Sequence, residues 1–318
     1  MAKKGQKILT QNRVKKLGLD KVSVITADMI DGFTSIGDSA FADCSSLTSV
    51  TIPNSITCIG YCAFFGCSSL KSVIIPNSVT YIGQHAFQCC EGLTSIKIPN
   101  SVSSIGLAAF AYCKGLTSIK IPDSITCIGK EVFEHCIGLT SIVIPNSVTS
   151  IEYMAFYNCT SLTSIVIPDS ITHIGRCAFT YCVGLTSILI PNSVTSIEYD
   201  AFFGCINLTT VTIKDKTCEN QSISNGKCNA YKAFNADMTC RGFQYKEGET
   251  YKFKGEPKLC ERGFHACLNI ADVFNYYYGK LGKDVIVHEV ELEGVSSSER
   301  RYDSKVVAKK ITIGKRIL

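Results

Sequence analysis

The sequence predicts an α/β solenoid, a stack of similar turns, followed by a small α+β domain. A phenylalanine returns every 23 residues, eight times in register, at Phe41, Phe64, Phe87, Phe110, Phe133, Phe156, Phe179 and Phe202. Around it the apolar positions repeat and the polar ones vary, and this periodicity stops after Ile213. A period in this range is typical of a solenoid, in which each turn packs against two neighbours to build one continuous core.

The first 32 residues are predicted to form a basic N-terminal cap. Residues 1–21 hold seven basic residues and one acidic residue, whereas residues 22–214 hold seven basic and twelve acidic ones. The apolar residues Ile8, Leu9, Val14 and Leu17 suit a turn of helix that packs over the first repeat. Because the basic charges lack interleaved aromatic residues, they do not indicate a specific nucleic-acid site.

The first seven repeats of the solenoid, residues 33–214, contain Leu-x-x-(Ile or Val)-x-Ile-Pro, as in Leu93 to Pro99, and Lys214 replaces the proline in the eighth. Apolar residues two apart predict a short strand with one buried face, and the proline ends its pairing because it has no N–H to donate. The Ala-Phe-x-x-Cys segment is expected to close the convex side as a short helical or 3₁₀ turn. A glycine recurs in one column, at Gly60, Gly83, Gly106, Gly129 and Gly175. Its recurrence suggests a backbone position that favours positive φ. Glu152 and Glu198 occupy the same column.

The combined frame, Leu-x-x-Ile-x-Ile and then Ile-Gly-x-x-Ala-Phe-x-x-Cys-x-x-Leu, resembles the 23-residue leucine-rich repeats of the BspA-like type. Such repeats are known from bacterial surface proteins and from protozoan parasites, and the resemblance covers residues 33–213. It implies a leucine-rich repeat solenoid with a parallel β-sheet on its concave face. It also implies a role in protein binding or cell adhesion, with a protein or cell-surface ligand.

Strand alternation predicts which side chains such a ligand would meet. If Ile96 and Ile98 point inward, Ser95 and Lys97 point outward. One outward column comprises Thr51, Ile74, Lys97, Lys120, Val143, Val166, Leu189 and Thr212, and its neighbour comprises Ser49, Ser72, Ser95, Ser118, Ser141, Ser164, Ser187 and Thr210. The apolar strip of Val143, Val166 and Leu189 favours a contact site. The alternative is that β-branched residues simply suit strands.

The eighteen cysteines are predicted to be reduced thiols. Eight of them form one column, Cys44, Cys67, Cys90, Cys113, Cys136, Cys159, Cys182 and Cys205. Neighbouring turns lie ~4.8 Å apart, but a uniform ladder offers no defined disulfide pairing, and free cysteine behaves as a small buried hydrophobe. With no secretory signal or membrane-length apolar run, the chain is expected to be a cytoplasmic monomer as written. The resemblance would also allow the cell surface or secretion.

Residues 215–235 are predicted to be a polar linker or C-cap, and residues 236–318 a small α+β domain. Alternating or apolar patterns suggest strands at 242–245, 250–253, 285–292 and 306–313, with a helix over 272–278. The segments 240–245, 263–267 and 272–277 are similar to a domain of unknown function in phage and gut-bacterial proteins. That domain accompanies repeat regions, which implies an end-cap or an attachment module.

A metal site is the first chemical hypothesis for this domain. Cys240, Cys260, His265 and Cys267 are four soft metal ligands. Structural zinc usually brings paired Cys-x₂₋₄-Cys knuckles, which these four residues lack. We therefore favour cysteine and histidine side chains in a small core, and predict no metal and no cofactor.

An enzyme is the second chemical hypothesis, because the order of residues is similar to that of ADP-ribosyltransferases. The similarity implies that Arg241 or His265 seats NAD, that Tyr276 contacts the nicotinamide and that Glu291 orients the acceptor. A carboxylate near an anomeric carbon can stabilise positive charge in the transition state. The same residue types also occur in an ordinary half-exposed sheet. We therefore favour a non-enzymatic recognition or adhesion protein.

Overall fold

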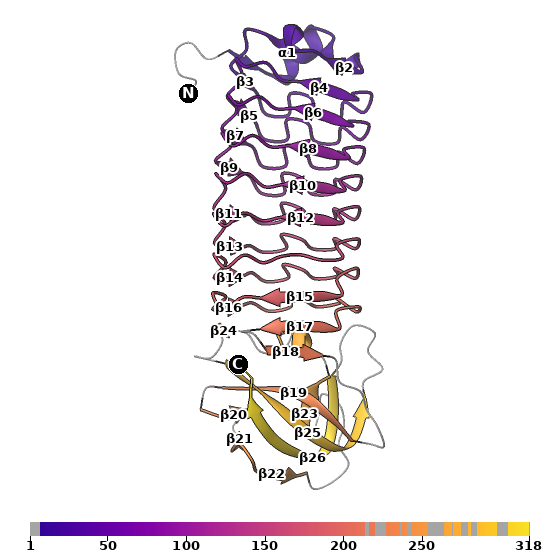
Figure 1. The fold of residues 1–318 in the computed structure, drawn as a ribbon. Helices are drawn as coiled ribbons and strands as arrows, with labels where there is room; N and C mark the ends of the chain where they lie inside the picture. The colour runs from indigo at the N-terminus through magenta and orange to yellow at the C-terminus, as the bar shows by residue number, and fades with distance from the viewer. Residues whose placement is uncertain are drawn as a thin grey trace.

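The computed structural model describes most of the chain, and it shows a straight column of about nine stacked turns above a β-rich C-terminal domain (Figure 1). The described residues are 7–213, 216–219, 227–235, 237–240, 243–253, 264–268, 270–274, 279–280, 285–297 and 305–317. The N-terminal segment covers the first turn, and the C-terminal domain lies against the last one (Figure 1).

One side of the column, which we call the β-face, is a row of short parallel strands. They are β2 (Val24–Ile25), β4 (Ser49–Thr51), β6 (Ser72–Ile74), β8 (Ser95–Lys97), β10 (Ser118–Lys120), β12 (Ser141–Val143), β15 (Ser187–Ile190) and β17 (Thr210–Ile213). Residues 23 apart lie side by side, as Ser95 does with Ser118. Val166 continues the row by bridging to Leu189. The strand alternation is as expected, with the middle residue of each strand buried.

A second parallel array follows the proline of each repeat, where the sequence predicts only a change of direction. Its two-residue strands are β1 (Ile8–Leu9), β3 (Ser35–Ile36), β5 (Cys58–Ile59), β7 (Tyr81–Ile82), β9 (Ser104–Ile105), β11 (Cys127–Ile128), β13 (Ser150–Ile151), β14 (His173–Ile174) and β16 (Ser196–Ile197). Backbone bonds such as Gly60 N–H to Ile36 O, at 2.8 Å, continue this array from turn to turn.

The remaining side of the column consists of turns, so the expected helical or 3₁₀ turns are not formed there. The physical reason is a pair of left-handed residues on either side of each phenylalanine, such as His85 with φ 56° and Cys89 with φ 61° around Phe87. Positive φ interrupts a right-handed helical run. The freed amides bond to the next turn instead, as Phe87 N–H does to Ala109 O at 2.8 Å.

The glycine column has a different cause from the one that the sequence suggests. None of Gly60, Gly83, Gly106, Gly129 and Gly175 has positive φ. A Cβ added to Gly83 would lie 2.4 Å from Gly60 O, and one added to Gly106 would lie 2.4 Å from Gln84 N. Close approach of consecutive turns therefore favours glycine at Gly60, Gly83, Gly106 and Gly175, whereas Gly129 has room for a Cβ.

The N-terminal segment packs onto the first turn through short elements, α1 (Gln11–Lys16), η1 (Leu19–Lys21) and η2 (Ala27–Ile30). Thr10 caps α1, with its hydroxyl accepting from Arg13 N–H at 3.4 Å, and the side chain of Val14 is buried. Strand β1 pairs with β3, and β2 pairs with β4. The first repeat therefore does not expose its apolar interior at this end.

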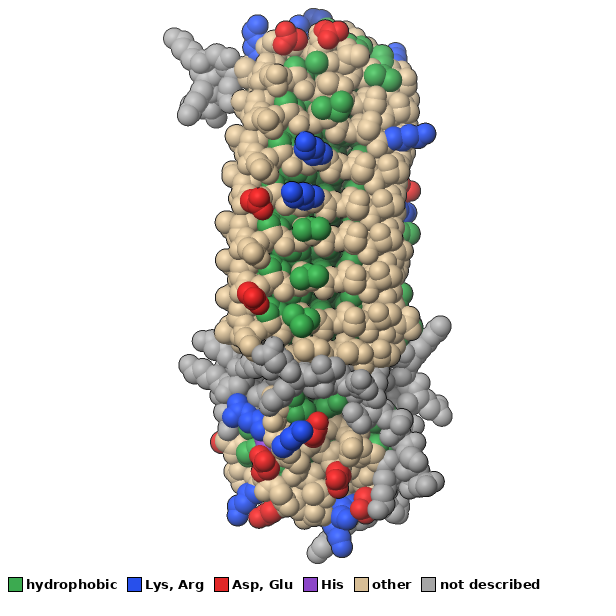
Figure 2. Space-filling model, viewed as in Figure 1, with side chains coloured by type: hydrophobic (Ala, Val, Ile, Leu, Met, Phe, Trp, Pro, Cys, Tyr) green, Lys and Arg blue, Asp and Glu red, His purple; other side chains and the backbone are tan. Residues whose placement is uncertain are grey.

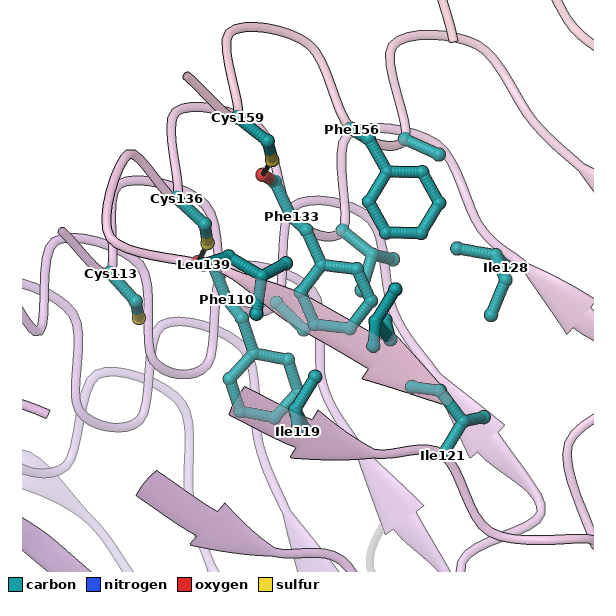
Figure 3. Close-up of a cluster of buried hydrophobic side chains, with 14 of the residues drawn as sticks. Phe110, Cys113, Ile119, Ile121, Ile128, Phe133, Cys136, Leu139, Phe156 and Cys159 are labelled. Atoms are coloured by element: carbon teal, nitrogen blue, oxygen red, sulfur yellow. Dashed lines mark hydrogen bonds between the residues drawn. The ribbon is translucent and has the colours of Figure 1, made fainter. Parts of the chain in front are cut away.

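The core of the column consists of ladders of identical side chains. The eight phenylalanines are buried, and consecutive rings stack with centroids 5.2 to 6.0 Å apart. Beside them the seven column cysteines from Cys67 to Cys205 each donate the thiol to the phenylalanine carbonyl of the preceding turn, as Cys136 Sγ does to Phe110 O at 3.2 Å (Figure 3). Sixteen cysteines of the described residues are free, which agrees with the expectation of reduced thiols.

The C-terminal domain is mostly β, which corrects the expected α+β class. Its elements are β18 (Lys216–Glu219), β19 (Lys227–Asn235), β20 (Thr239–Cys240), β21 (Phe243–Gln244), β22 (Thr250–Lys252), β23 (Phe264–Cys267), α2 (Ile270–Val273), β24 (Gly279–Lys280), β25 (Val285–Ser297) and β26 (Lys305–Arg316). β19, β23, β26 and β25 pair in a closed antiparallel ring. β18 and β19 lie in the segment predicted as a linker, and α2 is a single turn of four residues.

The C-terminal domain also closes the last turns of the column. β18 pairs antiparallel with β17, and β24 pairs antiparallel with β16. Buried side chains of the domain, among them Tyr231, Phe274 and Val287, belong to the same apolar cluster as the solenoid core. The final strands of both arrays therefore have partners, which removes an exposed sheet edge.

We expect Gly83→Ala to destabilise the protein by about 1–3 kcal/mol, because its Cβ would overlap the backbone of Gly60. Gly129→Ala is the matched control, since its nearest neighbour would be Val132 Cγ2 at 3.4 Å. That variant should be neutral or stabilised by about 0.4–1 kcal/mol. Urea unfolding of the two variants compares them directly. Equal effects at both positions would show that close approach does not explain the glycine column.

The thiol ladder should make the protein sensitive to alkaline pH. Burial raises the pKa of Cys67, Cys136 and Cys182 from 9.0 to about 12. The folded state therefore keeps protons that the unfolded chain loses above pH 9, so this contribution is complete below pH 9 and declines toward pH 12. Urea unfolding in reductant should give a lower midpoint at pH 10.5 than at pH 8.

In a Cys113→Ala/Cys136→Ala variant the urea midpoint should decline less steeply toward alkaline pH than in the parent.

Iodoacetamide should modify the half-exposed Cys62 of the native protein well before the buried column thiols. Uniform labelling rates, or an alkaline decline unchanged in the double variant, would contradict a buried proton-holding ladder.

Candidate functional site

The β-face carries a row of large aliphatic side chains in solvent. Ile74, Val143, Val166 and Leu189 are 62%, 64%, 75% and 51% exposed, respectively. They belong to the outward column that alternation predicts, and the inward neighbours Ile142, Ile165 and Ile188 are buried. Figure 2 shows basic and then hydrophobic side chains following one another along this face.

Two columns of hydroxyl groups lie beside this row, and they differ in their hydrogen bonds. Threonines preceding the strands donate to the turn before, as Thr117 Oγ1 does to Thr94 O at 3.3 Å and Thr140 Oγ1 to Thr117 O at 3.1 Å. The serine column is exposed, and the hydroxyls of Ser72, Ser95, Ser118, Ser141, Ser164 and Ser187 have no hydrogen-bond partner among the described residues. The serine hydroxyls are thus available to a ligand.

Lys97 and Lys120 are the charged residues of the two outward columns. They lie side by side on adjacent strands, and both are exposed. Among the described residues neither lysine makes an ion pair. Asp123 and Asp169 lie exposed in loops beside this face. The β-face therefore combines a positive upper part with an aliphatic lower part.

A pocket of about 420 Å³ adjoins the lower end of the aliphatic row. Its lining comprises Asp169, Leu189, Ile190, Pro191, Asn192 and Ser193. Leu189 belongs both to the pocket and to the exposed row, so the pocket extends the same surface rather than forming a separate site. The strand pattern alone gave no signal for this pocket, because the loop after β15 shapes it.

The turn side of the column carries a chain of half-buried aromatic rings. Tyr112 stacks on His135 with centroids 4.5 Å apart, and Tyr157 and Tyr181 continue the contacts at 5.4 and 5.7 Å. Burial, and then the nearby Lys114, lowers the pKa of His135. Asn158 Nδ2 lies 2.9 Å from His135 Nδ1. Because these rings cover one another, they form a rim of the core rather than a free stacking platform.

A polar cluster on the second array was not anticipated from the sequence. Ser150 Oγ donates to Glu152 Oε1 at 2.8 Å and lies 3.3 Å from Cys127 Sγ. His173 Nε2 is 3.5 Å from Glu198 Oε1. Burial raises the pKa of Cys127, so its thiol stays protonated and unreactive at neutral pH. Glu152 and Glu198 thus satisfy neighbouring polar groups where other turns carry glycine.

Of the residues Arg241, Tyr276 and Glu291 in the enzyme hypothesis, the described structure includes only Glu291. Arg241 and Tyr276 lie outside the described residues, and Glu291 is an exposed residue of β25, paired across to Asn229 and Thr312. For the zinc hypothesis, Cys240 is buried on β20 and Cys267 on β23, while Cys260 also lies outside the described residues. Within the described part of the chain no three metal-binding side chains cluster.

The helices that the structure describes are also too short and polar to cross a membrane.

Comparison with known proteins accounts for both parts of the chain. Residues 34–161 and 103–232 match the BspA type leucine rich repeat region, and residues 228–318 match a domain of unknown function (DUF7666). No curated protein matches the chain significantly.

Three solved structures are similar to the column. A leucine-rich repeat protein from Bacteroides ovatus is 33% identical with a TM-score of 0.56, over 62% of this chain and 52% of its own. A T. pallidum leucine rich repeat protein is 32% identical with a TM-score of 0.48, over 51% and 76%. A leucine rich cell surface protein from Faecalibacterium prausnitzii is 28% identical with a TM-score of 0.46, over 60% and 69%.

The chain spans about half the length of the Bacteroides ovatus protein. The repeat match itself extends from residue 34 to residue 232, more than half of this sequence, and it includes the stacked turns of the column from β3 to β17. The chain therefore belongs to the BspA type leucine rich repeat family.

Proposed function

We propose that this chain is a non-enzymatic recognition or adhesion protein that binds a protein or a cell-surface macromolecule through its β-face. The observation that supports the proposal is the exposed aliphatic row, in which Val143, Val166 and Leu189 are each more than half exposed on consecutive turns. Contiguous apolar surface of this kind often marks a contact site. The repeat family, as the sequence resemblance implies, is consistent with such a role.

The composition of the face favours a protein partner. Its two outward columns hold aliphatic, hydroxyl and lysine side chains and contain no aromatic residue. The preference of strands for β-branched residues explains the valines. It does not explain Leu189, which is exposed beside a pocket. Aliphatic contacts surrounded by hydroxyl groups match the usual anatomy of a protein interface, with an apolar centre and a polar rim.

The architecture around the face supports binding as a monomer. N-terminal elements cover the first turn, and β18 and β24 pair with the strands of the last turns. Stacking of copies end to end would require a free edge at these positions. The buried, hydrogen-bonded thiols are protected from solvent, so the column is compatible with the cytoplasm and equally with a cell surface.

The proposal is tested by replacing Val143, Val166 and Leu189 together with lysine. We expect partner capture from a mixture of candidate ligands to fall at least tenfold, because the apolar contact is lost. The melting temperature should change by only a few degrees, since the three side chains lie in solvent. Quantitative pull-down and thermal unfolding measure the two effects.

A matched control places the same change elsewhere on the column. Ile137, Val183 and Ile206 form another solvent-facing column and are at least partly exposed. Replacing these three residues with lysine should leave partner binding intact. Loss of binding in the control but not in the β-face variant would move the site away from the β-face.

A further inference from the structure

Resting on the proposed function, we infer that the β-face binds an extended protein segment that carries carboxylates at one end and aliphatic side chains at the other. The segment runs along the column, across the strands. Its acidic end contacts Lys97 and Lys120, and its aliphatic end contacts Val143, Val166 and Leu189. Each part of this assignment follows from a separate feature of the face.

The lysine pair defines the anionic end. Lys97 and Lys120 are adjacent in register, about 4.8 Å apart along the column, and like charges placed side by side in a sheet oppose each other. Elsewhere the fold neutralises a lysine across neighbouring turns, since Lys114 Nζ lies 2.7 Å from Glu91 Oε1. The β-face pair lacks such a partner among the described residues, so its positive charge is available to a carboxylate.

Position along the column fixes the order of the ligand groups. Four turns separate Lys97 from Leu189, which corresponds to about 19 Å at the strand spacing. An extended chain rises about 3.3 Å per residue, so about six residues span this distance. The aliphatic end of the segment would reach the pocket beside Leu189, whose lining combines Leu189, Ile190 and Pro191 with Asp169, Asn192 and Ser193.

The serine column indicates an extended backbone rather than a helix. Its hydroxyls repeat once per turn beside the aliphatic row and have no partner among the described residues. An extended chain presents unpaired backbone N–H and C=O groups, which need hydrogen bonds when they leave water. A helix already satisfies its own backbone groups. The free hydroxyl row therefore complements an extended segment.

The test is affinity selection of a random twelve-residue peptide library on the full chain at low salt. We expect enriched peptides to combine a cluster of Asp or Glu with a separate cluster of Leu, Ile or Val. The affinity of the best peptide should fall at least tenfold on Lys97→Glu/Lys120→Glu and weaken with added salt. Lys16→Glu/Lys130→Glu, which makes the same charge change at exposed lysines outside the two columns, should bind as the parent does.

The outcomes separate this inference from the proposed function. Peptides that lack acidic residues but lose binding in the Val143, Val166 and Leu189 lysine variant would overturn the inference and leave the proposed function standing. Enriched peptides that are insensitive to both sets of changes would overturn both. Thermal unfolding of each variant establishes that any loss of affinity arises in a folded protein.

Discussion

The stacking of each turn on the next at the strand spacing is the constraint on which the rest of the molecule depends. At about 4.8 Å between turns, a planar ring fits the repeat if it stacks on its own copy, which the phenylalanine centroids do at 5.2 to 6.0 Å. The same spacing leaves no room for a Cβ where backbones meet, as at Gly83. It also places each thiol against a carbonyl of the preceding turn. One distance thereby determines three columns of the repeat.

The stacking of turns also distinguishes side chains that hold neighbouring turns together from side chains that face a ligand. The threonines that precede the strands resemble a ligand-facing hydroxyl row in the sequence, but their side chains bond to the backbone of the turn before. The serines, only one residue further along, point outward and keep their hydrogen-bonding capacity. A column of polar side chains in a solenoid can therefore either bond neighbouring turns together or face a ligand. The hydrogen bonds of the side chains distinguish the two cases.

The repeat, its strands and their outward columns could be predicted because side-chain alternation has a period that reads directly from sequence. Other features could not. A two-residue strand such as β7 is too short to show a period. The left-handed positions hold residues as different as Ala108, Glu131 and Met154, so the residue type does not predict the backbone conformation there. The cause of the glycine column lies in the neighbouring turn rather than in the local chain. In the C-terminal domain, β19 escaped prediction because both of its faces are buried, which removes the alternation.

The rigidity of the β-face determines where the cost of binding falls. From β4 to β10 its strands pair on both sides, whereas in the described part of the chain β12 pairs only with β10 and Val166 bridges only to Leu189. A continuous core lies beneath all of them, so the side chains of the row begin in the positions that they would keep in a complex. Binding to a preorganised surface costs little ordering of the receptor, and most of the conformational cost then falls on the ligand segment. Affinity would depend on how well that segment matches the sequence of the row. Because the outward column already holds threonine, isoleucine, lysine, valine and leucine on similar turns, a change of Lys97 or Val143 within this set would alter the partner without altering the fold.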